Sequence, residues 1–135
     1  LRKNLEKIAF DGVKFFGKVS EDDKIELLSK AWVMVNPSVR EGWGLNVIEA
    51  NACGTPCIAY EVPGLRDSIR NEETGLLVKE DGDIEKLAEA MIRILKDEEL
   101  RMVLSENALE YSKNFSWDKT AEEFLKVVKG VVDGR

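Results

Sequence analysis

The chain has 135 residues, of which 44% are hydrophobic and 34% are charged, and its formal net charge is −6. This size and composition suit one domain with a sizeable core, and the acidity argues against nucleic acid or an anionic membrane surface as a partner. No apolar stretch approaches the roughly 20 residues of a membrane-spanning helix, so we expect a soluble, cytoplasmic protein without a transmembrane segment.

The first third of the chain is predicted to contain two helices with a short strand between them. Residues 1–10 have the character of the tail of a helix, and because the chain opens on Leu1 rather than methionine we expect a piece of a longer protein. A strand is predicted at residues 13–16. Ser20, with Asp23 three residues later, is typical of the start of a second helix. The apolar face expected for this helix consists of Ile25, Leu27, Leu28 and Ala31.

The middle of the chain alternates between strands and helices. Apolar runs at residues 32–36, 57–60 and 74–78 predict three further strands. Between them we expect a helix that begins near Gly44 and a short helix at residues 65–70. Strands joined through helices in this way are typical of a parallel sheet with right-handed crossovers. The aromatic residues that we expect in the core strands are Phe15, Phe16 and Trp32.

After Gly82 the pattern becomes entirely helical. Asp83 is the predicted cap of the first helix in this part. The fold class is therefore α/β, with a Rossmann-like parallel sheet flanked by helices and a helical C-terminal tail, in a single domain over residues 1–135. The three helices and a frayed end are predicted at residues 84–96, 98–111, 117–128 and 130–135.

The most informative segment follows the strand at residues 32–36, where two glycines come just after Glu41 and a second glutamate, Glu49, lies eight positions further on. The first turn of a helix leaves amide N–H groups without partners and carries the positive end of the helix dipole, so it attracts anions. Gly42 and Gly44 leave room for a diphosphate to approach the main chain. Glu49, about one turn into the helix, could accept hydrogen bonds from two ribose hydroxyls. The segment thus predicts a sugar-phosphate site at the carboxyl ends of parallel strands.

Other interpretations of the same segment stay open. The glycines also fit an ordinary strand-to-helix turn, with Glu49 as a solvated helix residue. Trp43 could pack across a sugar pocket or anchor the loop in the core. The dinucleotide-binding fingerprint is not met, since Val47 stands where glycine or alanine is expected, and no Gly-Lys-Ser/Thr phosphate loop occurs.

The cysteine and histidine content argues against a metal site. The chain has two cysteines, Cys53 and Cys57, and no histidine. Their spacing fits neither a zinc ligand set nor a redox Cys-x-x-Cys motif. We therefore expect no structural metal, and two small side chains buried between a helix and a strand.

Several stretches, in the right order, resemble the group 1 (family four) GT-B glycosyltransferases. The family signature, written E-x7-E and followed by Gly-x-Pro and a strand, is similar to Glu41-Gly42-Trp43-Gly44-Leu45 with Glu49 and then Gly54-Thr55-Pro56. The resemblance extends from about Val13 to the final helix, and it implies that the chain is the C-terminal, donor-binding half of a GT-B fold. The flanking stretches that also resemble the family are Phe16-Gly17-Lys18-Val19-Ser20, Val62-Pro63-Gly64 and Thr74-Gly75-Leu76-Leu77-Val78.

This resemblance implies that the parent enzyme moves a hexose from a nucleotide diphosphate-sugar to a hydroxyl acceptor, with retention of configuration and without a cofactor or an obligatory metal. Glu41 would contact the transferred sugar as the candidate catalytic residue, although not as a covalent nucleophile, and Glu49 would hold the ribose. The main chain of Val19 would pair with the nucleobase, and Lys24 is either a base or ribose contact or a solvated lysine. The remaining contacts to the donor would come from the amides of Gly42, Trp43, Gly44 and Leu45.

Two parts of such an enzyme are not expected within this chain. The family's arginine and lysine that clamp the diphosphate belong to an earlier strand-helix unit, and the acceptor site belongs to a separate N-terminal domain. We therefore expect the chain alone to be inactive, and its partners to be the donor and that acceptor domain, through which a cytoplasmic protein could also lie at the membrane surface. A non-catalytic Rossmann-like interaction or regulatory module and a glycoside hydrolase with paired carboxylates remain as alternatives.

Overall fold

A computed structural model describes residues 2–79 and 82–134 and places a three-stranded parallel sheet at the centre of the chain. The strands are hydrogen-bonded to one another in chain order, so each crossover joins neighbouring strands. Because all three run in the same direction, their carboxyl ends meet at one edge of the sheet, and the prediction of a parallel α/β fold is confirmed. The strands are β1 (Met34–Asn36), β2 (Cys57–Tyr60) and β3 (Gly75–Val78).

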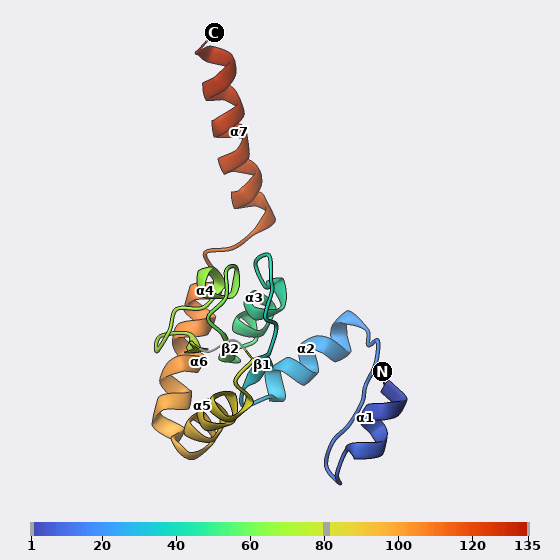
Figure 1. Cartoon of the computed structure of the whole chain (residues 1–135). Coiled ribbons are helices and arrows are strands. Elements are labelled where there is room, and N and C mark those ends of the chain that lie inside the picture. The colour runs from blue at the N-terminus through green and yellow to red at the C-terminus, as the bar shows by residue number, and fades with distance from the viewer. Residues whose placement is uncertain (1, 80–81, 135) are drawn as a thin grey trace.

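Seven helices occur within the described residues, and they account for most of the chain (Figure 1). Helices α3 and α4 pack against β2, helix α5 packs against β2 and β3, and helix α6 packs against α3 and α5. Their bounds are α1 (Arg2–Ile8), α2 (Glu21–Lys30), α3 (Leu45–Ala52), α4 (Leu65–Ser68), α5 (Ile84–Lys96), α6 (Glu98–Ser112) and α7 (Trp117–Asp133).

The core forms around β2, whose four residues are all buried. Each fully buried aliphatic side chain contributes roughly 1.5–3 kcal/mol to folding. The packing of helices α3 to α6 against the sheet and one another therefore holds the site-bearing loops in place. One large, fully buried side chain comes from each of α3, β2, α4, α5 and α6, namely Val47, Ile58, Leu65, Ile94 and Leu104.

The caps of two helices lie where the sequence predicts them. The Ser20 hydroxyl accepts a hydrogen bond from the Asp23 amide (3.1 Å) at the start of α2, and the Asp83 carboxylate accepts one from the Lys86 amide (3.0 Å) at the start of α5. The apolar face expected for α2 is not packed into the core, since no residue of this helix is buried and Ile25 is 51% exposed. In Figure 1, α2 points away from β1 and the sheet, so little of its apolar side meets the core.

The strand predicted at residues 13–16 does not form. A strand requires a neighbour on which to pair, and the sheet of described residues has none beside these residues. Instead this segment follows α1, where the Arg2 guanidinium donates a hydrogen bond to the Phe15 carbonyl (3.1 Å).

Two of the aromatic residues expected in the core are exposed, and that expectation is wrong for them. Phe16 is 56% exposed and Trp32 is 59% exposed, whereas Phe15 is half-buried. The guanidinium of Arg101 lies 4.3 Å from the centre of the Trp32 ring. Trp32 is thus covered in part by a cation–π contact rather than by apolar packing.

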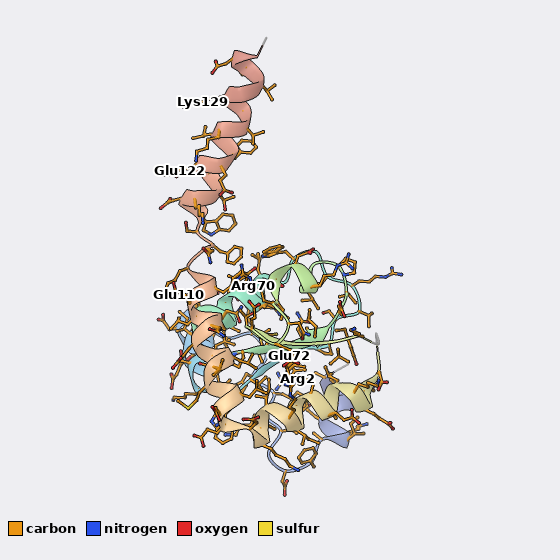
Figure 2. The ribbon with its side chains drawn as sticks, turned by 90° about the vertical axis from the view of Figure 1, so that its left-hand side faces the viewer. Arg2, Arg70, Glu72, Glu110, Glu122 and Lys129 are labelled. Atoms are coloured by element: carbon orange, nitrogen blue, oxygen red, sulfur yellow. The ribbon has the colours of Figure 1, made fainter. Side chains whose placement is uncertain are left out.

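Helix α7 projects from the body of the molecule as an isolated rod (Figures 1 and 2). None of its residues is buried, and the stretch between Glu122 and Lys129 stands clear of the other elements in Figure 2. The helix continues to Asp133, so the predicted fraying from Gly130 is wrong up to that point; residue 135 lies outside the described residues. No helix in the described ranges, α7 included, is long and apolar enough to cross a membrane.

The two cysteines are free thiols that differ in burial. Cys57, in β2, is fully buried as predicted, and burial raises the pKa of its thiol to about 12. Cys53, just after α3, is only half-buried. Cys57 therefore behaves as a small core side chain.

Asn51 in α3 is fully buried, yet neither polar atom of its side chain has a hydrogen-bond partner. A buried amide without partners costs roughly 1–3 kcal/mol. We therefore expect Asn51→Leu, which keeps a similar volume without polar atoms, to raise the free energy of unfolding by about 1–2 kcal/mol, as measured by urea denaturation. Asn107→Leu on the exposed side of α6 is the matched control and should leave stability unchanged. A less stable Asn51→Leu variant would contradict this prediction.

Candidate functional site

The loops that follow β1 and β2 lie against each other at the carboxyl edge of the sheet. The first loop carries Glu41 and Gly42 and leads into α3, and the second carries Gly64 and leads into α4. A Cβ atom placed on Gly64 would lie 2.5 Å from the carbonyl oxygens of both Glu41 and Gly42. The backbone of the second loop at Gly64 therefore packs directly against the backbone of Glu41 and Gly42.

Helix α3 begins at Leu45, directly after Gly44, whose φ of 81° and ψ of 57° place it in the left-handed region. Gly44 is buried, and a Cβ atom there would lie 2.9 Å from a methyl group of Leu65. Both facts require glycine at this position. The first turn of α3 contains no acidic residue, so nothing within the helix neutralises the positive end of its dipole.

The amides of this turn differ in whether they are already satisfied. Within the described part of the chain, the amides of Trp43, Gly44 and Leu45 donate no hydrogen bond to another group. The Gly42 amide is occupied, since it donates to the Glu41 carboxylate (3.1 Å). Unsatisfied donors at a helix start are suited to an anion, and here three of the four predicted amides meet that condition.

The side chain of Glu49 is 47% exposed, and its carboxylate pairs with Lys24 of α2. The Lys24 Nζ atom lies 3.0 Å from Glu49 Oε1 and 2.8 Å from Glu21 Oε2. Hydrogen bonds to Glu21 and Glu49 raise the pKa of Lys24 above its ordinary value, so the lysine is charged at neutral pH. The second carboxylate oxygen of Glu49, Oε2, accepts no bond within the described residues and can accept one from a ligand hydroxyl.

Two asparagines close the base of the loop at residues 37–44, which we call the glycine loop. The Asn36 side chain, buried at the end of β1, donates to the side chain of Asn46 in the first turn of α3 (3.4 Å). The oxygen of the same Asn36 amide accepts a hydrogen bond from the Ser38 amide (3.1 Å). The two ends of the loop are thereby tied to each other.

The outer side of the loop carries an aromatic contact that the sequence analysis missed. The Trp43 ring meets the Phe115 ring edge to face, with centroids 5.8 Å apart and planes at 63°. Phe115 lies more than sixty positions further along the chain, between α6 and α7, so no local pattern marks the contact. A hollow of about 430 Å³ opens beside it, lined by Trp43, Leu45, Ile48, Glu49, Phe115, Ser116, Trp117 and Thr120.

The remaining predicted residue, Val19, lies at the margin of this site. It is half-buried directly before Ser20, the cap of α2, and its main chain makes no hydrogen bond within the described residues. Within the same residues no group of three or more His, Cys, Asp or Glu side chains is placed to hold a metal ion.

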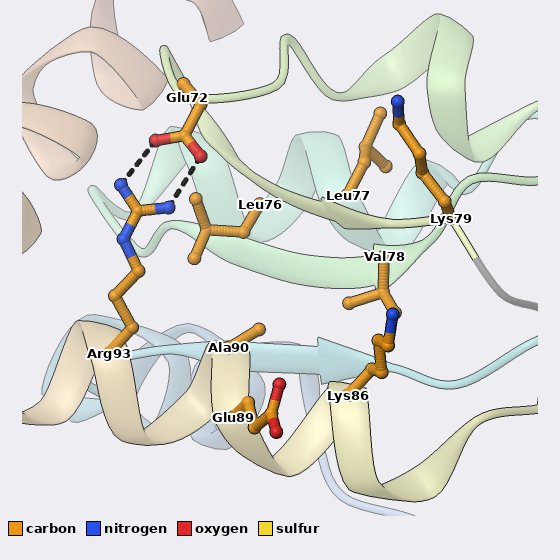
Figure 3. Close-up of a pocket in the computed structure, with 9 residues that line it drawn as sticks. All are labelled: Glu72, Leu76, Leu77, Val78, Lys79, Lys86, Glu89, Ala90 and Arg93. Carbon is orange, nitrogen blue, oxygen red and sulfur yellow. Dashed lines mark hydrogen bonds and ion pairs between the residues drawn. The ribbon is translucent and has the colours of Figure 1, made fainter.

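A second hollow of about 420 Å³ lies elsewhere, between β3 and α5 (Figure 3). There the Glu72 carboxylate accepts two hydrogen bonds from the Arg93 guanidinium, at 2.6 and 2.7 Å. This pairing lowers the pKa of Glu72. None of the predicted site residues lines this hollow, so the glycine loop remains the candidate site.

The sequence matches the family described as "Glycosyl transferases group 1" over residues 2–111. The D-inositol 3-phosphate glycosyltransferase of Salinispora tropica is 39% identical over 118 residues, which cover 87% of this chain and 24% of that protein. Among solved structures, sucrose-phosphate synthase from Thermosynechococcus elongatus superposes with a TM-score of 0.87 at 34% identity, covering 99% of this chain and 34% of the other.

A more distant structure shares the fold. Anabaena HepE, solved in complex with UDP-glucose, superposes with a TM-score of 0.83 at 19% identity, over 96% of this chain and 35% of that chain. This chain thus spans about a quarter to a third of the length of the proteins it matches. Both likenesses extend over nearly all of this chain, so its parallel α/β fold is one found in GT-B glycosyltransferases, as the sequence predicts.

Proposed function

Because this chain belongs to the group 1 glycosyltransferases, we propose that it binds the nucleotide diphosphate-sugar from which its parent enzyme transfers a hexose to a hydroxyl acceptor. The observation that carries the proposal is the start of α3. There, three amides without a hydrogen-bond partner among the described residues lie one turn from a carboxylate with one oxygen that accepts no bond from those residues. Amides at a helix start suit a diphosphate, and the carboxylate suits vicinal hydroxyls.

Each predicted residue has a role that fits its position. The amides of Trp43, Gly44 and Leu45 receive the diphosphate and the sugar next to it. Glu49 accepts hydrogen bonds from the ribose through Oε2, while Lys24 holds Oε1 and so fixes the orientation of the carboxylate. Val19 offers the nucleobase a main chain that makes no hydrogen bond to any described residue.

Glu41 is the candidate for the transferred sugar. The Glu41 carboxylate accepts a hydrogen bond from the Gly42 amide, so we infer that donor binding exchanges this internal hydrogen bond for sugar hydroxyls and frees the Gly42 amide for the ligand. Such an exchange keeps the number of hydrogen bonds constant and therefore costs little. Glu41 acts here by contact with the sugar and not as a covalent nucleophile.

The parent enzyme requires parts that this chain does not supply. We propose that an arginine and a lysine elsewhere in the parent clamp the diphosphate, because stabilisation of the leaving group is usually the largest catalytic term. We also propose that the acceptor site lies in an N-terminal domain of the parent enzyme. With cationic side chains and amides in place of a metal, transfer proceeds with retention and without a divalent cation, in the cytoplasm.

The decisive test is a panel of UDP-, GDP- and ADP-hexoses, including UDP-glucose, titrated against the full-length protein while released nucleotide diphosphate is measured. We expect one nucleotide to bind, to shift the backbone amide resonances of Gly44, Leu45 and Glu49, and to turn over in the presence of EDTA. Unperturbed amides at millimolar nucleotide would contradict the proposal and favour a non-catalytic module. Release of phenol from an aryl glycoside without nucleotide would instead favour a glycoside hydrolase.

A further inference from the structure

The glycine loop has one large side chain, and that side chain is held from outside the loop. Trp43 lies between Gly42 and Gly44, is 36% exposed and meets the ring of Phe115 edge to face. A Cβ atom added to Gly42 would meet no atom within 4 Å, and glycine itself restricts the backbone little, so the loop could take several backbone conformations if Trp43 were free. A contact that holds the Trp43 ring in place can therefore restrict the backbone conformation of the loop.

Phe115 is itself anchored to the body of the protein. Its ring meets the Tyr111 ring edge to face, with centroids 5.0 Å apart, and the Arg70 guanidinium lies 4.5 Å above the Tyr111 ring. The Phe115 amide donates to the Ser112 carbonyl (3.0 Å), which keeps the turn after α6 closed. A continuous series of contacts thus runs from Arg70, next to α4, through the end of α6 to the glycine loop.

From this arrangement we propose that Phe115 is a positioning residue for the glycine loop. This proposal rests on the function proposed above. Gly64 supports the loop from below, the pair Asn36–Asn46 closes its base, and Phe115 fixes Trp43 from the outside. A change in φ or ψ of Trp43 turns the peptide planes on both of its sides and carries the ring along, so a ring held in place restricts such changes. The direction of the Trp43 and Gly44 amides is therefore set by a residue that itself has no place among the predicted donor contacts.

The alternative is that Phe115 only stabilises the domain. Phe115 is 37% exposed and lies outside the buried core cluster, so its truncation should cost the global fold little. The two roles therefore separate in one set of variants.

We expect Phe115→Ala in the full-length protein to weaken binding of the nucleotide diphosphate roughly three- to tenfold, the factor that corresponds to one lost edge-to-face contact. The unfolding midpoint should stay close to that of the parent. The amide resonances of Gly42, Gly44 and Leu45 should shift already without nucleotide. Phe115→Tyr, which keeps the ring, should bind the nucleotide diphosphate as the parent does and should show the parent's amide resonances. Phe124→Ala, a truncation on the exposed side of α7, is the matched control and should change neither.

The outcomes distinguish this proposal from the proposed function. If the parent protein binds nucleotide and Phe115→Ala binds it equally well with unchanged loop resonances, the positioning role is wrong while the donor site stands. If the parent binds none of the nucleotides, the donor site is wrong and the positioning role falls with it. Should Phe115→Ala lose stability, Phe115→Leu, which fills the space without a ring, must still weaken binding while remaining folded, or the role is purely structural.

Discussion

Gly64→Ala is expected to destabilise the protein by about 3 kcal/mol or more and to weaken nucleotide binding by about tenfold to a hundredfold. Gly64 has φ 87° and ψ −54°, a conformation that costs any other residue roughly 1–3 kcal/mol. Its Cβ atom would also lie 2.5 Å from two carbonyl oxygens, those of Glu41 and Gly42. The loop must move to relieve this contact, and it takes the Glu41 carboxylate and the Gly42 amide with it.

Gly12→Ala separates the clash from the strain. Gly12 also has a positive φ, 104°, but no atom lies within 4 Å of the Cβ position. This control should cost about 1 kcal/mol and leave nucleotide binding unchanged. Chemical denaturation gives the stability of each variant and calorimetric titration gives its affinity. Equal losses in the two variants would show that the Gly64 contact does not position the loop.

Glu49→Ala is expected to weaken binding of the nucleotide diphosphate by about 1.5–3 kcal/mol, the range for a hydrogen bond to a charged group. The loss arises because Oε2 no longer accepts the ribose hydroxyl and because Lys24 keeps Glu21 as its only carboxylate partner. Titration of the nucleoside alone should show the same difference, since the diphosphate binds elsewhere in the site.

Two variants test this interpretation of Glu49. Glu49→Gln keeps the shape without the charge and should lose less affinity than Glu49→Ala, because neutral hydrogen bonds are weaker. Glu21→Gln removes the other carboxylate partner of Lys24 and should leave affinity nearly unchanged. If Glu49→Ala binds the nucleotide diphosphate as tightly as the parent does, the ribose role of Glu49 is wrong.

The elements that the sequence predicts correctly are those whose determinants are local. Ser20 and Asp83 cap their helices with side chains three residues from the amides they satisfy. The run at residues 57–60 is apolar throughout and forms the buried central strand. The segment at residues 13–16 has a strand-like composition but no partner strand in the part of the chain that the structure describes, and pairing is not a local property. Trp32 is exposed for a related reason, since its burial depends on what lies beyond β1.

The same distinction applies to the candidate site. The order of Glu41, the two glycines and Glu49 within one strand-loop-helix unit is visible in the sequence, and the start of α3 lies where that order places it. The pairing of Lys24 with Glu49 joins residues twenty-five positions apart, and the sequence analysis did not predict it; the resemblance implied only a separate role for each residue. Phe115 was missed entirely, because its partner Trp43 lies in another part of the chain.

The isolation of α7 gives it the mechanics of a lever. Its 17 residues extend about 25 Å at 1.5 Å per residue, and it is fastened to the body through the short segment that contains Phe115. A swing of about 10° at this pivot displaces the far end by roughly 4 Å, whereas the Phe115 ring, close to the pivot, moves by only a small fraction of that distance. A small rotation around Trp43 would therefore displace the far end of α7 by a much larger distance. Conversely, a large displacement of that end would move the glycine loop only slightly.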